Sequence, residues 1–172
     1  AGMSTLTGFT VAMGDPLFGE TAYPLTVETS LTGTRIAYGA GGRIGPILYG
    51  ADGEAEVLGW LLHPNLPGLL LRDFDSWTSV WSAAPNLPSS LIRVFARRAG
   101  VHVFTEAGDQ VLSGAGVLAV HASGDGMREV RFPYICTVSD AITGGLIASG
   151  AERTSLSMMK GDTALLRIEQ TG

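Results

Sequence analysis

The sequence offers few residues of the kinds that perform nucleophilic catalysis. A reactive serine or cysteine needs a base beside it and a third group that orients this base. The Gly-x-Ser-x-Gly turn that presents such a serine in many hydrolases does not occur around Ser76 or Ser113. Cys136, the single cysteine, lies in an apolar strand pattern that is typical of a buried structural thiol. We therefore predict no catalytic nucleophile in the chain.

The three histidines do not have the spacing of a metal site. His63, His102 and His121 lie far apart, and no second potential ligand accompanies any of them at short range. His102 and His121 lie in apolar segments, which favours histidines of the core or of an interface. The glycine-rich run 39–42 is not followed by a helix whose N-terminus could bind phosphate. We therefore predict neither a metal ion nor another cofactor.

Two pairs of acidic residues have the spacing of side chains on one face of a strand, Glu54 with Glu56 and Asp73 with Asp75. Glycosidases place two carboxyl groups about 5 Å or about 6.5–9.5 Å apart across the bond that they cleave. The chain has 16 acidic residues, however, so that such pairs arise readily by chance. Solvation of loop edges explains both pairs, and we predict no catalytic pair from them.

The tryptophans are the best candidates for a binding site. Trp77 and Trp81 are four residues apart, so on a strand their rings would point the same way, about 13 Å apart at about 3.3 Å per residue. Rings spaced in this way could stack on successive sugar rings. Packing beneath the helix that follows is the favoured alternative. Trp60 is a further candidate for carbohydrate binding, and Tyr38 and Tyr49 are weaker ones.

The composition indicates a well-packed chain with a covered surface. A length of 172 residues suits one ordinary domain or two small ones. Hydrophobic residues make up 45% of the sequence, and the mean hydropathy is +0.27. Charged residues make up 16%, against about 25% in an average protein. These values favour a chain that hides part of its surface against another domain or subunit.

Several partners are excluded by the charge pattern. The net charge is −5 and no basic run is longer than Arg97-Arg98, so we predict no nucleic-acid partner. No apolar run approaches the roughly 20 residues that cross a bilayer, so we predict no membrane partner. With one cysteine, no disulfide can form within the chain, and the cellular compartment stays open.

Short apolar runs separated by Gly and Pro predict a chain of strands. The expected strands are Leu6–Met13, Leu25–Thr29, Arg35–Tyr38, Pro46–Tyr49, Val57–Leu62, Leu69–Phe74, Trp77–Ala83, Val101–Thr105, Gln110–Leu112, Val117–Ala122, Glu129–Phe132, Cys136–Asp140, Leu146–Ala148, Thr154–Met158 and Ala164–Glu169.

One helix is predicted over about residues 88–99. Pro88 suits the first turn, and Gly100 suits the left-handed residue that follows a helix. The period of the apolar residues predicts a buried face and an arginine face. The buried face would contain Leu91, Ile92, Phe95, Ala96 and Ala99, and the exposed face Arg93, Arg97 and Arg98. With a strand on each side, this segment resembles the last strand–helix–strand unit of an α/β sheet.

The pattern changes near Glu106, where Gly-Gly and Asp-Gly turns begin to alternate with short strands. We therefore predict a mixed α/β chain that is mostly β, in two parts. Residues 1–105 would form an incomplete α/β layer with one main helix. Residues 106–172 would form an antiparallel, β-sandwich-like domain.

Several segments in this order resemble the C-terminal region of glycoside hydrolases that carry a β-galactosidase trimerisation-type domain, followed by a small β-domain. The resemblance runs from about Leu6 to Glu169. Its segments are Glu56–Trp60, Gly68–Phe74, Trp77–Pro85, Arg98–Phe104, Gly116–Ala122, Arg128–Pro133, Val138–Gly144 and Met159–Thr163.

The resemblance implies a glutamine-amidotransferase-like α/β fold that has lost its catalytic residues. In that family the small β-domain has a strand ending at Pro and an Asp-x-x-Thr-Gly turn, which Phe132-Pro133 and Asp140–Gly144 match. The catalytic carboxylates of the family lie in an upstream barrel that has no counterpart here. The early strands of the amidotransferase-like fold are also missing, which suggests a C-terminal fragment or remnant.

Three functions are therefore considered. The leading one is a non-catalytic accessory or oligomerisation segment of a carbohydrate-active protein, with a second copy or an upstream catalytic domain as partner. The first alternative is a carbohydrate-binding module that uses exposed aromatic residues. The second is a small hydrolase whose site forms between subunits. Exposure of Trp60, Trp77 and Trp81 separates the first two, and a polar cleft at a symmetric interface would favour the third.

Overall fold

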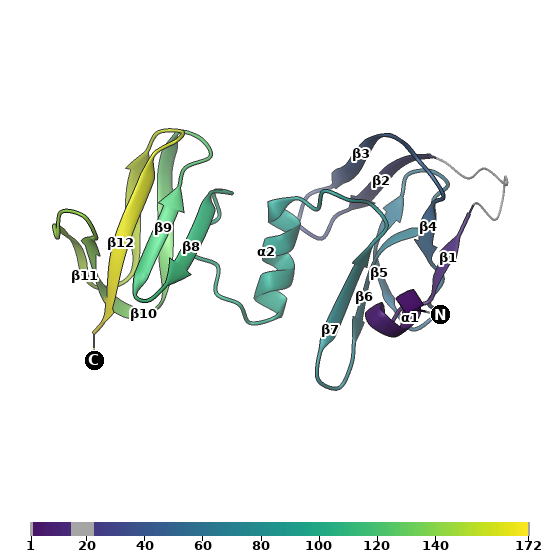
Figure 1. Cartoon of the computed structure of the whole chain (residues 1–172), viewed down its shortest axis with the longest axis horizontal. Coiled ribbons are helices and arrows are strands. Elements are labelled where there is room, and N and C mark those ends of the chain that lie inside the picture. Colours follow the sequence, from purple (N-terminus) through teal and green to yellow (C-terminus); the bar gives the residue numbers. More distant parts are fainter. Residues whose placement is uncertain (1, 15–22, 172) are drawn as a thin grey trace. The chain divides into compact units, whose positions relative to one another are not determined.

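The structure, a computed structural model, describes residues 2–14 and 23–171 and is mostly β. All the strand pairs formed by these residues are antiparallel. The chain divides into two compact units, Ala1–Val94 and Phe95–Gly172 (Figure 1). The predicted division at Glu106 falls inside the second unit. Among the described residues, no helix is long and apolar enough to cross a membrane.

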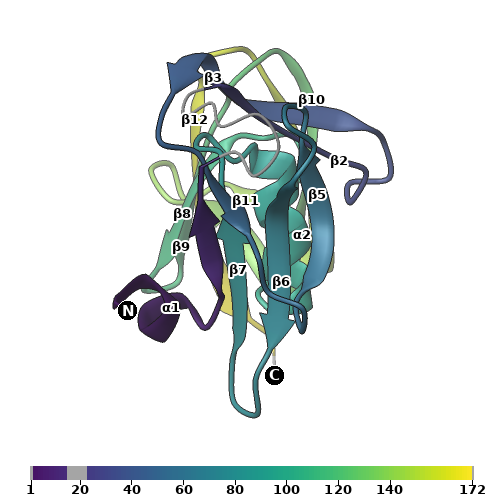
Figure 2. The ribbon, with the colours of Figure 1, turned by 90° about the vertical axis from the view of Figure 1, so that its right-hand side faces the viewer.

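The first unit contains one five-stranded sheet with the order β3-β2-β5-β6-β7 and a separate pair of strands, β1 and β4. The elements are α1 (Gly2–Thr7), β1 (Val11–Met13), β2 (Tyr23–Thr29), β3 (Ile36–Ile44), β4 (Leu48–Gly50), β5 (Glu56–Leu61), β6 (Pro67–Asp73) and β7 (Thr78–Ser82), followed by α2 (Ser89–Arg98), which begins in this unit. Figure 2 shows β6 and β7 side by side, joined by a hairpin turn.

Strand β6 lies at the centre of the first unit's core. Leu69, Leu70 and Leu71 follow one another and are all buried, so both faces of this strand are covered. Leu70 packs with Phe9 and Trp81 in one hydrophobic cluster. An antiparallel strand with one solvated face would alternate instead. The continuous leucine run is therefore explained by packing on both sides.

The incomplete α/β layer predicted for residues 1–105 is not what the described residues form. Their sheet is antiparallel, and 101–105 contain no strand. The carbonyl oxygen of Phe104 accepts a hydrogen bond from Arg131 N–H, and the Phe104 side chain packs on the core of the second unit. Phe104 thus lines a core from irregular backbone, whereas Val101 is 57% exposed. The apolar composition of the segment does not distinguish such backbone from a strand.

Helix α2 lies within the range predicted from the sequence and ends as the glycine suggests. Gly100 has φ 72°. Its N–H donates to Arg97 O, and the N–H of Val101 donates to Ala96 O. This pair of bonds is a Schellman motif, which satisfies carbonyl groups at the helix end.

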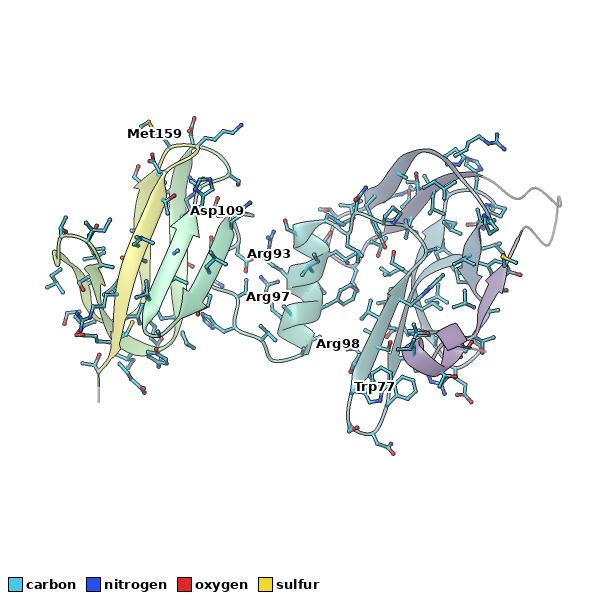
Figure 3. All side chains as sticks on the ribbon, in the orientation of Figure 1. Trp77, Arg93, Arg97, Arg98, Asp109 and Met159 are labelled. Carbon is cyan, nitrogen blue, oxygen red and sulfur yellow. The ribbon has the colours of Figure 1, made fainter. Side chains whose placement is uncertain are left out.

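The predicted buried face of α2 is only partly right. Leu91 is fully buried, whereas Ile92 is 54% exposed. Phe95 is half-buried and Ala99 is exposed. The predicted buried face was too wide, because Leu91 is the only residue of α2 that is buried. Figure 3 shows that the side chains of Arg93 and Arg97 project from one side of the helix.

The second unit contains one five-stranded antiparallel sheet with the order β11-β10-β12-β9-β8. Its strands are β8 (Gln110–Gly114), β9 (Val117–His121), β10 (Gly126–Asp140), β11 (Leu146–Met158) and β12 (Thr163–Gln170). The glycine clusters that predicted hairpins lie in the turns between them. Only the β8–β9 and β10–β11 turns join paired strands, however, so the other two clusters are not hairpin turns. The core consists of Leu118, Val120, Ala122, Val130, Phe132, Cys136, Val138, Met158 and Leu166.

Strand β10 replaces two predicted strands and bends between them. Its first half pairs with β11, and its second half pairs with both β11 and β12. The register breaks between Arg131 and Cys136, and Pro133 lies in this break. A proline is tolerated there because it removes no ladder hydrogen bond.

Candidate functional site

The structure does not place the three tryptophans together. Trp81 is buried, whereas Trp60 and Trp77 are 46% and 47% exposed. Trp81 is a core residue, as the favoured packing interpretation had it, so it cannot form a stacking array with Trp77. Trp77 precedes β7 and belongs to the hairpin turn, where the alternation of a strand does not apply.

Trp77 forms a stack with Phe74 at the end of the β6–β7 hairpin. The two ring centroids are 4.4 Å apart and the rings are inclined by 9°. The guanidinium carbon of Arg72 lies over the Phe74 ring, 5.0 Å from its centroid. The N–H of Phe74 donates to Trp77 O, 2.8 Å away, which closes the turn. Figure 3 shows the Trp77 side chain beside this turn.

A glycine makes room for the Phe74 ring. A Cβ atom on Gly8 would lie 2.3 Å from Cζ of Phe74, which is closer than any real contact. Gly8 also has φ 75°, a conformation that favours glycine. The segment after α1 therefore supports the stack from outside the hairpin.

Arg72 is held by two carboxylates. Its Nη1 lies 3.2 Å from Oδ2 of Asp52, whose side chain is 5% exposed, and its Nη2 pairs with Glu54. Asp52 also accepts hydrogen bonds from the N–H groups of Thr10 and Glu54. These bonds lower the pKa of Asp52 despite its burial, and the bond from Thr10 has the largest effect. A fixed Arg72 in turn fixes the position of the Phe74 ring.

The acidic pairs found in the sequence lie near this stack. Asp73 and Asp75 are exposed at the hairpin, and Oδ1 of Asp73 accepts a hydrogen bond of 2.6 Å from Thr78 Oγ1. Glu54 is ion-paired to Arg72, and Glu56 lies opposite Leu71 on the neighbouring strand. Glu54 and Asp73 are thus engaged in contacts within the protein.

Two of the three histidines, His102 and His121, make hydrogen bonds within the second unit. His102 Nε2 is 2.9 Å from Arg131 O, and its ring meets Phe104 edge-on. His121 Nδ1 is 2.8 Å from Thr163 Oγ1. His121 is exposed and is therefore not a core residue, so that of the two predicted alternatives only an interface histidine stays a prediction for it. His63 lies in the other unit, and no group of three potential ligands gathers within residues 2–14 and 23–171.

Cys136 is a structural thiol, as predicted. It is fully buried, and burial raises the pKa of its thiol. Its Sγ donates to the carbonyl oxygen of Ala151, 3.4 Å away. A buried, protonated thiol is a poor nucleophile because the thiolate is the reactive form.

The second unit contains a buried ion pair that no pattern in the sequence predicts. Nε of Arg128 lies 3.0 Å from Oδ2 of Asp109, and their side chains are 4% and 0% exposed. Arg128 also donates to the carbonyl oxygens of Gly124, Gly126 and Met158. The two residues are 19 positions apart, a spacing that no motif would have indicated.

A tight turn presents apolar side chains at the β10–β11 hairpin. Oδ1 of Asp140 accepts hydrogen bonds from the N–H groups of Ile142 and Thr143, at 2.9 and 2.7 Å. These bonds lower the pKa of Asp140, and the bond from Thr143 has the largest effect. Ile142 is 79% exposed and Leu146 is 69% exposed. The fixed backbone thus holds two large apolar side chains in solvent.

No protein-family model and no curated protein matches the sequence. Among solved structures, the β-galactosidase from Bacillus circulans sp. alkalophilus is similar, with a TM-score of 0.54 and 19% identity over 96% of this chain and 25% of that one. The E323A catalytic mutant of Gan42B, a GH42 β-galactosidase from G. stearothermophilus, gives a TM-score of 0.50 and 10% identity over 98% and 25%. The chain thus spans about a quarter of their length. At these identities the similarity concerns the fold.

Proposed function

We propose that this chain is a non-catalytic accessory unit of a carbohydrate-active protein. One observation carries the proposal. Almost the whole of this chain is similar in fold to a segment of each of two β-galactosidases, and that segment makes up about a quarter of each of them. A fold that occurs as a minor part of larger glycosidases is well suited to support a catalytic domain. Fold alone does not determine chemistry, so the side chains must be considered as well.

The side chains support a non-catalytic role. Glu54 is ion-paired to Arg72, and the hydrogen bonds that the Asp52 carboxylate accepts, above all the one from Thr10, lower the pKa of Asp52. The Cys136 thiol is buried and has a raised pKa. His102 and His121 are engaged in hydrogen bonds with Arg131 O and Thr163 Oγ1. None of these groups is poised as an acid, base or nucleophile.

We further propose that the unit assembles with a second copy or with a catalytic domain. The strand β11 lies at an edge of its sheet, and an edge strand offers unpaired N–H and C=O groups. Ile142, Leu146 and Ile147, at and beside the start of β11, are exposed. Burial of such apolar groups is the usual driving force of association.

Two measurements test this proposal. The purified chain should not hydrolyse nitrophenyl β-galactoside above the buffer rate. Turnover that survives repurification and is lost in Asp75→Asn would contradict a non-catalytic role. In sedimentation equilibrium at micromolar concentration, we expect a mass above the 17.9 kDa of one chain. The double variant Leu146→Lys, Ile147→Lys should return the monomer, whereas Leu112→Lys, in a different strand, serves as control.

A second candidate function is saccharide binding by exposed aromatic residues. The observation that favours it is the half-exposed ring of Trp77, stacked almost parallel to Phe74. Trp60 is similarly exposed but lies opposite Pro67, at the other end of β6. A ring that is held in place and open to solvent is the kind of surface on which a sugar ring can stack.

A further inference from the structure

We infer that Trp77 forms a binding platform for a single neutral pyranose ring. The inference rests on the second candidate function, saccharide binding. It specifies the residue that binds, the class of sugar and the number of sugar rings bound. It does not depend on the accessory role, which the assays of turnover and mass test separately.

The platform is organised before any ligand arrives. Trp77 is stacked on Phe74 with an inclination of 9°, and the Phe74 ring is fixed by the close approach of Gly8 and by Arg72. Arg72 is itself held by the buried carboxylate of Asp52. A side chain that is already ordered loses little conformational entropy on binding, which favours even a weak ligand.

The open ring and its rim match the surface of a sugar. An indole ring presents a face of negative partial charge, on which the C–H groups of a pyranose can lie. The hydroxyl groups around such a sugar ring need donors and acceptors at the edge of the platform. Asp75 and Ser76 form the turn before Trp77, and Thr78 follows it; all three are exposed. Carboxylates accept hydrogen bonds, and serine and threonine hydroxyls both donate and accept.

The charge of the rim favours a neutral ligand. Asp73 and Asp75 lie in the hairpin, and Glu54 is ion-paired to Arg72 nearby. A uronic acid would therefore meet carboxylates and be repelled. An organic cation would be attracted, but strong recognition of such cations uses several aromatic walls, whereas Trp77 offers one flat face.

The site is suited to one sugar ring. Trp81 is buried and cannot extend the platform. Trp60 lies opposite Pro67, near the start of β6, while the Trp77 turn follows its end. Six residues of strand separate these positions, about 20 Å. With one stacked ring, we expect a dissociation constant on the order of millimolar.

The test uses the indole N–H signals of the full chain in two-dimensional NMR. The three tryptophans give three signals, which single Trp→Phe variants assign. Titration with methyl β-galactopyranoside and methyl β-glucopyranoside should shift the Trp77 signal saturably and leave those of Trp60 and Trp81 in place. Trp77→Ala should abolish binding, measured by saturation transfer to the sugar, while Trp60→Ala should retain it.

Two further titrations separate the ligand classes. Methyl β-glucuronide should bind at least fivefold more weakly than the neutral sugar, and Asp75→Asn should reduce this difference. A Trp77 signal that responds to choline and not to the neutral sugars would overturn the inference. So would an unchanged Trp77 signal with both sugars, or saturation transfer that persists in a folded Trp77→Ala variant. Circular dichroism of each variant checks that it is folded.

Discussion

Oδ2 of Asp109 lies 3.0 Å from Nε of Arg128, and both side chains are almost completely buried. The other oxygen of Asp109 accepts hydrogen bonds from the N–H and the hydroxyl of Ser123. The pair therefore joins the segment before β8 to the β9–β10 turn and, through Met158 O, to the end of β11. Figure 3 shows Asp109 and Met159 at the same end of the second unit.

We expect Asp109→Ala to destabilise the second unit strongly. The substitution leaves the Arg128 guanidinium buried without its counter-charge, which costs about 3–5 kcal/mol. Urea unfolding followed by circular dichroism gives the free energy of unfolding. Arg167→Ala is the control, because Arg167 and its partner Glu169 are both more than half exposed. That change should cost about 0–1 kcal/mol, and equal losses in the two variants would contradict the role of the buried pair.

The carboxyl group of Asp109 should also make the stability of the fold depend on pH. Burial acts to raise the pKa of Asp109, but the bonds from Arg128 and Ser123 outweigh it, and the pKa is lowered. A carboxyl group with a lowered folded pKa stabilises the fold above its unfolded pKa of about 3.9 and loses this contribution as pH falls through the folded value.

The melting temperature of the wild type should therefore fall below about pH 4, and that of Asp109→Asn should fall less. Asp52 and Asp140 also have lowered pKa values and contribute in the same direction, so the variant keeps part of the acid dependence. Thermal unfolding between pH 7 and pH 2 measures both curves. Parallel curves would show that Asp109 does not contribute.

Two neighbouring residues of α2 should differ sharply in their effect on stability. Leu91 is fully buried and Ile92 is 54% exposed. Leu91→Ala should cost about 2–5 kcal/mol because it removes core contacts and leaves a cavity. Ile92→Ala, on the same helix, should change the free energy by about 0.5 kcal/mol or less. Chemical denaturation gives the free energy of unfolding of both variants. A larger loss for Ile92→Ala than for Leu91→Ala would contradict the burial of Leu91.

The glycine run in β3 should contain one essential position. A Cβ atom on Gly39 would lie 1.9 Å from the carbonyl oxygen of Leu25, and φ is 145°. Gly39→Ala should therefore cost about 1–3 kcal/mol or more, since backbone cannot move aside as a side chain can. Gly41→Ala is the matched control, because nothing lies within 4 Å of its Cβ position. Similar melting temperatures for the two variants would refute this packing.

Local signals in the sequence predicted much of the backbone. Gly100 marks the end of a helix because few residues adopt its left-handed conformation, and that conformation is present with φ 72°. The turns of the second unit follow from glycines for the same reason. Proline was a less reliable guide: Pro133 suggested a strand end, yet β10 continues through it, because the strand has no ladder partner at that point.

The site residues were harder to predict because exposure is decided by tertiary packing. Trp77 and Trp81 have the spacing of one strand face, but β7 begins only at Thr78, so one ring is exposed and the other buried. The Asp109–Arg128 pair depends on strands that meet only in the folded chain. Phe74 lies near Trp77 across an Asp-Ser turn in the sequence, but the stacking of the two rings depends on how the hairpin folds.

The bend of β10 limits which insertions and deletions the chain can tolerate. The buried positions Arg128, Val130 and Phe132 precede it, and Cys136 and Val138 follow it. All five numbers are even, so the four-residue step from Phe132 to Cys136 preserves the alternation of the strand. Removal of one residue from this step would reverse the parity of the second half and turn Cys136 and Val138 to solvent. Removal or insertion of two residues would keep it, so length variation at this bend should occur in pairs.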